Sequence, residues 1–204
     1  MSALVVKIGG SLWRSSLLAR WIAALREFPG PLTIVPGGGP FADAVRAAQP
    51  SMGFSDRVAH KMAILAMEQY GLALVDKFAG LECAASPREA GAVHARGNIA
   101  VWRPSVMASA LNVAASWDVT SDSLSAAYAR ASGAARLLLV KSVDVDAALD
   151  SPSLVDPCFA SHAAGLDVFI AGPGALDGAP EILARGGVAG SRVSFASSSR
   201  KIAS

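Results

Sequence analysis

Two glycine-rich segments near the start of the chain each follow a short apolar run. The first contains Lys7, Gly9, Gly10 and Ser11, and the second is residues 37–40, three glycines and a proline. Glycines let backbone N–H groups approach an anion closely, and the N-terminus of a following helix favours the same negative charge. Lys7 adds a positive charge beside the first segment. Together the segments predict a site for anionic groups, with an ordinary glycine turn as the alternative for the first.

Residues 37–42 also match the loose Gly-x-Gly-x-x-Ala pattern of dinucleotide-binding proteins. That pattern normally follows the first strand of the fold, whereas here it follows the second predicted strand. A nicotinamide-dependent oxidoreductase is therefore the weaker interpretation. The Gly-x-x-x-x-Gly-Lys-Ser/Thr loop of P-loop kinases is absent from the sequence.

Further polar residues occur at two later points in the chain. Asp118 and Asp122 are four residues apart around a predicted helix start. Either is a candidate N-cap, and two carboxylates beside hydroxyls also suit a lysine or a metal–nucleotide complex. Lys141, Ser142 and Asp144 follow an apolar run, and ligands of open α/β sheets bind where the strands end. The histidines and cysteines lack zinc-ligand spacing, so no metal site built by the protein is predicted.

The elements that must position these residues alternate along the chain. Short β-branched or leucine-rich runs, most of them uniformly apolar, predict strands at residues 4–8, 32–35, 99–102, 137–140, 168–171 and 192–195. Alanine-rich stretches between them predict helices at residues 16–27, 41–48, 55–79, 121–132 and 181–185. This alternation predicts an α/β fold, a three-layer αβα sandwich around a mostly parallel sheet. Apolar spacing in the longest helix predicts packing on two sides, within the core alone or against a partner subunit.

Length and composition limit the class of protein. The 204 residues predict a single domain over residues 1–196, with a flexible tail at 197–204. With 52% hydrophobic and 17% charged residues and a net charge of +2, the chain is predicted to be globular and not to bind nucleic acid. Apolar runs are too short for a membrane span, and no signal peptide is recognised. Two cysteines make no disulfide framework, which indicates a cytoplasmic protein.

In order and spacing, the four segments together resemble the amino acid kinase superfamily, over residues 5–194. The resemblance implies an amino acid kinase-like fold, with an acceptor-binding part at about residues 1–115 and a nucleotide-binding part at about 116–196. It implies ATP and Mg²⁺ as cofactors and a small-molecule phosphate substrate. Lys7 would contact the transferred phosphoryl group and Asp122 would orient Lys7. The residues implied to bind the nucleotide are Gly9, Gly10, Ser11, Lys141, Ser142 and Asp144, and those implied to bind the acceptor are Gly37, Gly38, Gly39 and Asp118.

Within the superfamily, residues 53–71 and 117–122 are similar to small kinases of methanofuran and methylofuran biosynthesis, in one-carbon metabolism. Their acceptor is (5-(aminomethyl)furan-3-yl)methyl phosphate, and the implied products are its diphosphate and ADP. Asp56 is the candidate partner of the acceptor's ammonium, and His60 or Arg57 the candidate for polar contacts. The alternatives are that Asp56 only stabilises the helix dipole and that His60 is a structural histidine.

Two features depart from the superfamily pattern. Val145 stands where a glycine normally follows the Val-Asp pair, and no lysine between Lys141 and Lys201 takes the place of a second, late catalytic lysine. Lys141, Arg185 and Arg192 are the candidates to replace it. The other hypotheses are a related kinase for uridylate, isopentenyl phosphate or an acylamino acid, and a non-catalytic nucleotide- or oxyanion-binding protein. The apolar long helix favours a homo-oligomer.

Overall fold

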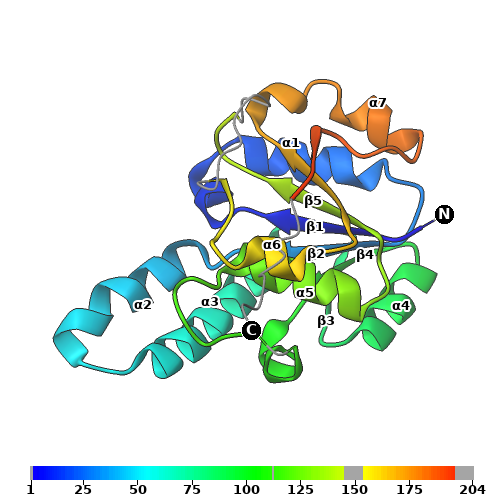
Figure 1. Cartoon of the computed structure of the whole chain (residues 1–204). Coiled ribbons are helices and arrows are strands. Elements are labelled where there is room, and N and C mark those ends of the chain that lie inside the picture. Colours follow the sequence, from blue (N-terminus) through cyan, green and yellow to red (C-terminus); the bar gives the residue numbers. More distant parts are fainter. Residues whose placement is uncertain (1, 112, 145–153, 196–204) are drawn as a thin grey trace, which may run out of the picture.

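A seven-stranded sheet forms the centre of the computed structural model, which describes residues 2–111, 113–144 and 154–195. Its order is β3-β4-β2-β1-β5-β6-β7, and every neighbouring pair is parallel except β6 and β7, which are antiparallel (Figure 1). The predicted fold class, a mostly parallel sheet between helical layers, is confirmed. The strands are β1 (Leu4–Ile8), β2 (Leu32–Pro36), β3 (Leu81–Ala84), β4 (Ile99–Trp102), β5 (Arg136–Val140), β6 (Asp167–Ala171) and β7 (Ser191–Val193).

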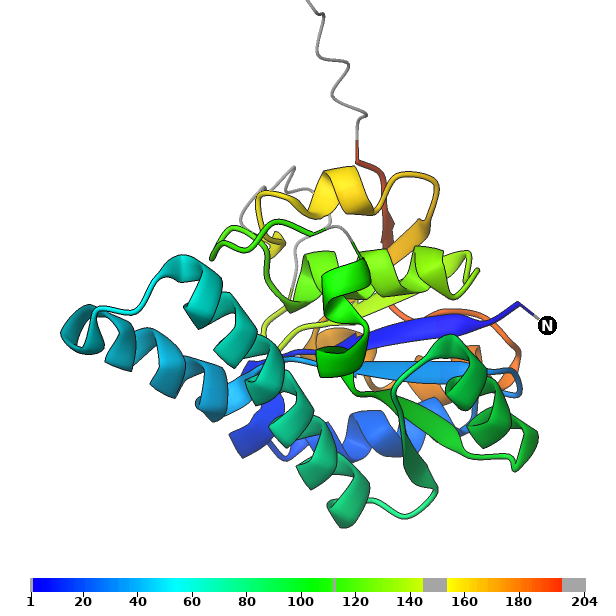
Figure 2. The same cartoon turned by 90° about the horizontal axis from the view of Figure 1, so that it is seen from below.

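Helices cover both faces of this sheet, as Figures 1 and 2 show. On one face, α1 (Leu17–Arg26) and α7 (Ala179–Ala184) pack with alternate residues of the central strands in one core cluster. On the other, α5 (Ser121–Ala131) and α6 (Phe159–His162) pack in a second cluster, while α4 (Pro87–Ala95) covers β3 and β4. Because both faces are covered, β1, β2 and β4 are buried at every residue, which explains why their sequences are apolar except at Lys7 and Thr33.

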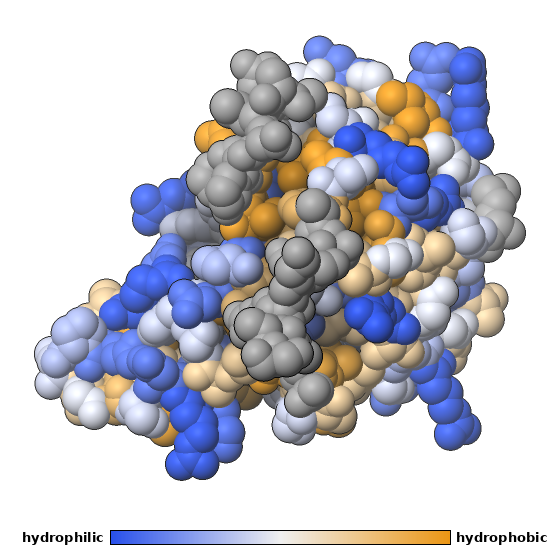
Figure 3. Space-filling model, viewed as in Figure 1, coloured by the Kyte–Doolittle hydropathy of each residue, from blue (hydrophilic) through white to orange (hydrophobic). Residues whose placement is uncertain are grey.

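Helices α2 (Gly39–Met52) and α3 (Asp56–Lys77) form an antiparallel pair whose connecting end projects from the sheet (Figures 1 and 2). Gly53 ends α2 with φ +68°, a left-handed conformation that glycine adopts without strain. Hydrophilic residues are frequent over the projecting end in Figure 3. Nearer the sheet, α3 places Ile64 and Met67 in one core cluster and Tyr70 and Leu74 in the other. The long helix therefore packs on two sides, as its sequence predicts.

The sequence prediction missed some elements and misplaced some ends. Edge strand β3 and helix α4 were not predicted, and α2 continues two residues past Pro50 instead of ending at residue 48. Short 3₁₀ turns, also not predicted, occupy Gly10–Arg14, Pro104–Val106, Ala108–Ala110 and Pro173–Ala175. The predicted tail and Val145 lie outside the described residues. Among the helices that the structure describes, none has the length and apolar character to cross a membrane.

Candidate active site

The two glycine loops contact each other through their backbones at the carboxyl ends of β1 and β2. A Cβ atom on Gly37 would lie 2.5 Å from the Gly10 nitrogen, and one on Gly10 would lie within 3.0 Å of the Gly39 backbone. No side chain fits at either position unless the loops separate. The parallel pairing of β1 with β2 brings the loops together, since Ile8 and Pro36 are partners in register. The structure thus joins the two segments into one site.

Only some amides of these loops are free for a ligand. The Gly9 N–H donates to Val140 O (3.1 Å), and the Gly37 N–H donates to Ile8 O (2.9 Å). These two amides extend the hydrogen bonding of the sheet, so the expectation that they donate to phosphates is wrong. Both glycines instead allow close approach of the backbone, because they carry no side chain. Gly38 and Gly39 lie at the N-terminus of α2, where the helix itself offers the amides no carbonyl partner.

Behind the loops, three charged side chains form a buried chain. Lys7 Nζ lies 2.9 Å from Asp122 Oδ1, and Lys141 Nζ lies 2.7 Å from Asp122 Oδ2. The three side chains are 8%, 15% and 7% exposed for Lys7, Lys141 and Asp122. They come from the ends of β1 and β5 and the first turn of α5. One carboxylate therefore holds two ammonium groups, which leaves one net positive charge near the glycine loops.

Burial and neighbouring charge shift the pKa values of this chain. Burial disfavours the charged form of Asp122, but the two lysines outweigh that effect and lower the pKa of its carboxyl group. Burial, helped by the charge of Lys7, lowers the pKa of Lys141 against the opposing influence of Asp122. Asp122 is therefore ionised at neutral pH, and Lys141 loses its proton more readily than an exposed lysine.

A second buried carboxylate fixes the start of α5. Asp156 accepts hydrogen bonds from the Thr120 N–H (2.9 Å), the Thr120 hydroxyl (2.8 Å) and the Ser123 N–H (2.9 Å), as well as from the Ser123 hydroxyl. Thr120 itself is the N-cap, and its hydroxyl accepts from the Asp122 N–H. The expectation that Asp118 or Asp122 caps this helix is wrong. Asp122, in the first turn, is instead free to meet the lysines.

The turns after β5 and β6 pack together in the same manner as the glycine loops. A Cβ on Gly172 would lie 2.5 Å from Val143 O, and the Gly174 N–H donates to Asp144 Oδ1 over 2.6 Å. Asp144 thus braces the two turns. Ser142 accepts a hydrogen bond from the Ser11 hydroxyl (2.8 Å), which links the turn after β5 to the first glycine loop.

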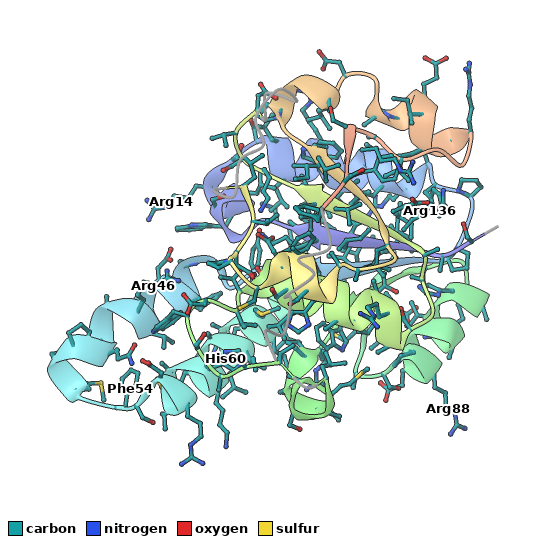
Figure 4. The ribbon with its side chains drawn as sticks, in the orientation of Figure 1. Arg14, Arg46, Phe54, His60, Arg88 and Arg136 are labelled. Carbon is teal, nitrogen blue, oxygen red and sulfur yellow. The ribbon has the colours of Figure 1, made fainter. Side chains whose placement is uncertain are left out.

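A cavity of about 240 Å³ lies between the glycine loops, the α2–α3 pair and the start of α5. It is lined by Gly10 and Ser11, by Gly38, Gly39, Ala42, Asp43 and Arg46, by His60, Ala63, Ile64 and Met67, and by Trp117, Val119, Thr120, Ser121 and Leu124. Figure 4 shows Arg46 on α2 and His60 on α3, with Phe54 in the turn between these helices. Burial lowers the pKa of His60, although a hydrogen bond with the Ser116 backbone opposes the shift. The ring is therefore neutral at pH 7.

Besides Gly37, both predicted acceptor aspartates lie outside the lining of this cavity. Asp56 is exposed and accepts a hydrogen bond from Gln49 Nε2 (2.8 Å), and Asp118 is also exposed. Neither lines the cavity, whereas Asp43 and Arg46, which the sequence analysis missed, do. Asp43 lies four residues after Gly39 in α2, and such residues share one face of a helix. That spacing was the signal available in the sequence.

Of the three candidates for a second catalytic lysine, the structure brings Lys141 to the site. Arg185 pairs with Glu181 on the surface (2.6 Å), and Arg192 pairs with Asp167, also on the surface. Lys141 instead shares Asp122 with Lys7. A second ammonium group thus reaches Asp122 from the end of β5.

The residues present fit a nucleotide that carries its own metal ion. Free amides, two hydroxyls and two ammonium groups face the region between the glycine loops and the turn after β5. Among the described residues, no three His, Cys, Asp or Glu side chains gather as a metal cage. Mg²⁺ commonly keeps several waters and binds through substrate phosphates with few carboxylates, so a dedicated cage is not required.

Comparison with known proteins agrees with this arrangement. The model of the amino acid kinase family matches residues 2–147, more than half of the chain. A curated relative, the (5-(aminomethyl)furan-3-yl)methyl phosphate kinase of Methanocaldococcus jannaschii, is 32% identical over 124 residues. That match covers 59% of this chain, and the chain spans only 57% of the relative's length.

Solved structures share the fold at low sequence identity. The uridylate kinase of Archaeoglobus fulgidus has a TM-score of 0.67 at 15% identity, with 95% of this chain and 100% of that chain covered. The UMP kinase of Ureaplasma parvum has a TM-score of 0.65 at 14% identity, covering 95% and 99% of the two chains. The UMP kinase of Bacillus anthracis gives 0.65 at 16%, covering 93% and 94%.

Proposed function

The chain belongs to the amino acid kinase family, a family of phosphotransferases, and we propose that it transfers the γ-phosphoryl group of ATP to a small phosphate monoester. The observation that carries the proposal is the chain Lys7–Asp122–Lys141 behind two touching glycine loops. Phosphoryl transfer requires a protein mainly to align two anions and neutralise the charge between them. Two buried ammonium groups held by one carboxylate, beside free amides, are suited to that task.

Each group has a separate part in the proposed reaction. Lys7, beside Gly9 of the first loop, stabilises the phosphoryl group in transfer, and Lys141 stabilises the negative charge that develops toward the leaving ADP. Asp122 holds both lysines in place through its two carboxylate oxygens. Ser11, Ser142 and the Gly10 amide bind nucleotide phosphates, with Asp144 bracing the turn that carries Ser142. Mg²⁺, carried in by the nucleotide, supplies further charge neutralisation.

The acceptor binds in the cavity beside the amides of Gly38 and Gly39. An oxygen of its phosphate attacks the γ-phosphorus, the bond to the bridging oxygen of ADP breaks, and a diphosphate forms. A phosphate oxygen is already anionic near neutral pH, so no strong general base is needed. His60, the histidine in the cavity, is a weaker base than an exposed histidine because burial lowers its pKa.

The acceptor we propose is (5-(aminomethyl)furan-3-yl)methyl phosphate, the compound in the name of the relative from M. jannaschii. The cavity of about 240 Å³ is smaller than the roughly 300–1,000 Å³ of pockets for drug-sized ligands. A monoester with one small ring suits that size. Apolar side chains of Ile64, Met67 and Trp117 in the cavity wall would contact such a ring.

The proposed enzyme is a homo-oligomer that acts in the cytoplasm. Exposed Leu65 and Leu72 lie two turns apart on α3, and exposed apolar residues on one helix support a contact between subunits. The assembly is not required for the chemistry described above, since the lysines, glycine loops and cavity all lie within one chain.

The test is an ADP-release assay with ATP, Mg²⁺ and a panel of acceptors: the furan phosphate, the corresponding unphosphorylated alcohol, and UMP. We expect turnover of the furan phosphate and none of the alcohol. The product should show the paired ³¹P signals of a diphosphate. Turnover of UMP alone would contradict the proposed acceptor, and no ADP release with any acceptor would contradict the proposed reaction class.

Lys7→Met provides the control for contaminating kinases. It removes the ammonium group while keeping a long apolar side chain, so the fold should persist, as circular dichroism can verify. Activity that remains in Lys7→Met at the wild-type rate would show that the reaction does not use this site.

A further inference from the structure

The acceptor cavity contains one carboxylate among its lining residues, all of which the structure describes. It belongs to Asp43, whose side chain is 74% exposed. The other ionisable side chains in the lining are those of Arg46 and His60. Arg46 is a cation and the His60 ring is neutral at pH 7, so neither can pair with a positively charged ligand. Asp43 is thus the group in the cavity wall that can pair with a positively charged ligand.

Asp43 lies at a defined distance from the amides that would bind the acceptor's phosphate. Gly39 begins α2 and Asp43 follows four residues later, on the same face and about 6 Å along the helix axis. This separation is comparable to that between a phosphate and an amine attached through single carbons to opposite sides of a five-membered ring. A ligand with both groups could therefore contact both parts of α2 at once.

Neighbouring contacts leave this carboxylate available. Arg46 Nη1 is 3.5 Å from Asp43 Oδ1, at the limit of a hydrogen bond, and Oδ2 takes no part in that contact. The Arg46 guanidinium lies instead over the Trp117 ring, 4.5 Å from its centroid. The indole N–H of Trp117 donates to Gln49 Oε1 (2.7 Å). Arg46 is therefore held by an aromatic ring as well as by Asp43.

The same contacts remove Asp56 from consideration. Gln49 donates from Nε2 to Asp56 Oδ1 (2.8 Å) while it accepts from Trp117, so Asp56 supports Trp117 through Gln49. Its carboxylate lies outside the cavity lining. From the sequence, Asp56 is the candidate partner of the ammonium, whereas the structure places Asp43, and not Asp56, in the cavity wall.

We infer that Asp43 recognises a primary ammonium group on the acceptor and so selects phosphate monoesters that carry an amine. The inference rests on the proposed function, since it assigns a part of the acceptor to a residue of the same cavity. It requires no covalent step by Asp43: the carboxylate accepts hydrogen bonds from the ammonium and orients the ring while the phosphate lies at Gly38 and Gly39. Asp43 is therefore a specificity-determining residue.

The experiment compares two acceptors that differ only in the amine: (5-(aminomethyl)furan-3-yl)methyl phosphate and its analogue with a methyl group in place of the aminomethyl group. Steady-state kcat/KM is measured for wild type, Asp43→Asn, Asp56→Asn and the control Asp76→Asn. Asp76 is an exposed acid near the C-terminal end of α3, so its substitution matches the change in charge at a distance from the cavity.

We expect Asp43→Asn to lower kcat/KM for the amine acceptor by about tenfold to a hundredfold, the range for loss of a hydrogen bond to a charged partner. The amine-free analogue should react equally with Asp43→Asn and wild type, which also shows that the variant is folded. Asp76→Asn should leave both acceptors unchanged.

Three results would overturn the inference. Equal losses for both acceptors in Asp43→Asn would make its role structural, and no loss for either would make it irrelevant. An amine-selective loss in Asp56→Asn alone would move the ammonium site to Asp56. Failure of the proposed function looks different, because wild type would then turn over neither furan acceptor.

Discussion

Replacement of Gly37 by alanine tests the contact between the two glycine loops. The new Cβ would lie 2.5 Å from the Gly10 nitrogen, 3.0 Å from Gly10 Cα and 3.1 Å from Ile8 O, where ordinary contacts begin at 3.4 Å. All three neighbours are backbone atoms, so no side chain can rotate away. The loops must therefore separate by about 1 Å.

Such a displacement should affect catalysis more than stability. Misplacement of reacting groups by about 1 Å can reduce the rate about a hundredfold. Overpacking of this kind costs about 1–3 kcal/mol of unfolding free energy, which a protein of this size can tolerate. We therefore expect Gly37→Ala to remain folded and to lose about two orders of magnitude in kcat, measured by coupled ADP release.

Gly91→Ala is the matched control. Gly91 lies inside α4, where an added Cβ would meet nothing within 4 Å. Alanine there should leave kcat unchanged and raise the unfolding free energy by up to about 1 kcal/mol in urea titrations. An unchanged kcat in Gly37→Ala would refute the claim that the glycine loops must touch for catalysis.

Three further predictions concern the charged and polar groups around the loops. Lys141→Met should lower kcat by about a hundredfold or more with little change in the KM for the acceptor. Separate saturation curves for ATP and acceptor measure both constants. An effect on KM alone would contradict the role of Lys141 in the transition state. Asp156→Ala should lower the unfolding free energy by about 2–4 kcal/mol in urea titrations, because the amides at the start of α5 lose their acceptor. A smaller change would mean that the start of α5 is stable without the Asp156 carboxylate. The melting temperature should fall as pH drops below about 6.5, because the folded state holds the pKa of His60 below its unfolded value and the unfolded chain takes up the proton first. In His60→Gln that fall should be smaller, and an identical pH profile would contradict the assignment.

The sequence predicted the strands that carry the site because those strands are buried on both faces. Such strands are mostly apolar and several end at recognisable glycines, as β1 does before Gly9, with Lys7 as its one charged residue. Strand β3 was not predicted because it lies at the edge of the sheet, where Glu82 and Cys83 are only half-buried and the sequence shows no continuous apolar run. Ser86 and Glu89 form a capping contact that marks the start of α4 and was available as a local signal.

The acceptor side of the site was less predictable than the glycine loops. The glycine loops can be recognised in the sequence by residue type. Their contact with each other follows because the strands that they end are parallel neighbours. The position of Asp56 depends on which side of α3 faces the cavity, and Gln49, seven residues earlier in the chain, decides what its carboxylate contacts. The hydrogen bonds of Asp156 join residues more than thirty positions apart, a pairing that local pattern cannot reveal.

The central claim is that the two glycine loops and the chain Lys7–Asp122–Lys141 hold donor and acceptor phosphates in line. A crystal structure with a non-hydrolysable ATP analogue and the furan phosphate measures this most directly. The account predicts that Lys7 Nζ lies about 3 Å from a γ-phosphate oxygen, with the acceptor phosphate at the amides of Gly38 and Gly39. A γ-phosphate bound away from Lys7, or an acceptor phosphate outside the cavity beside α2, would contradict it.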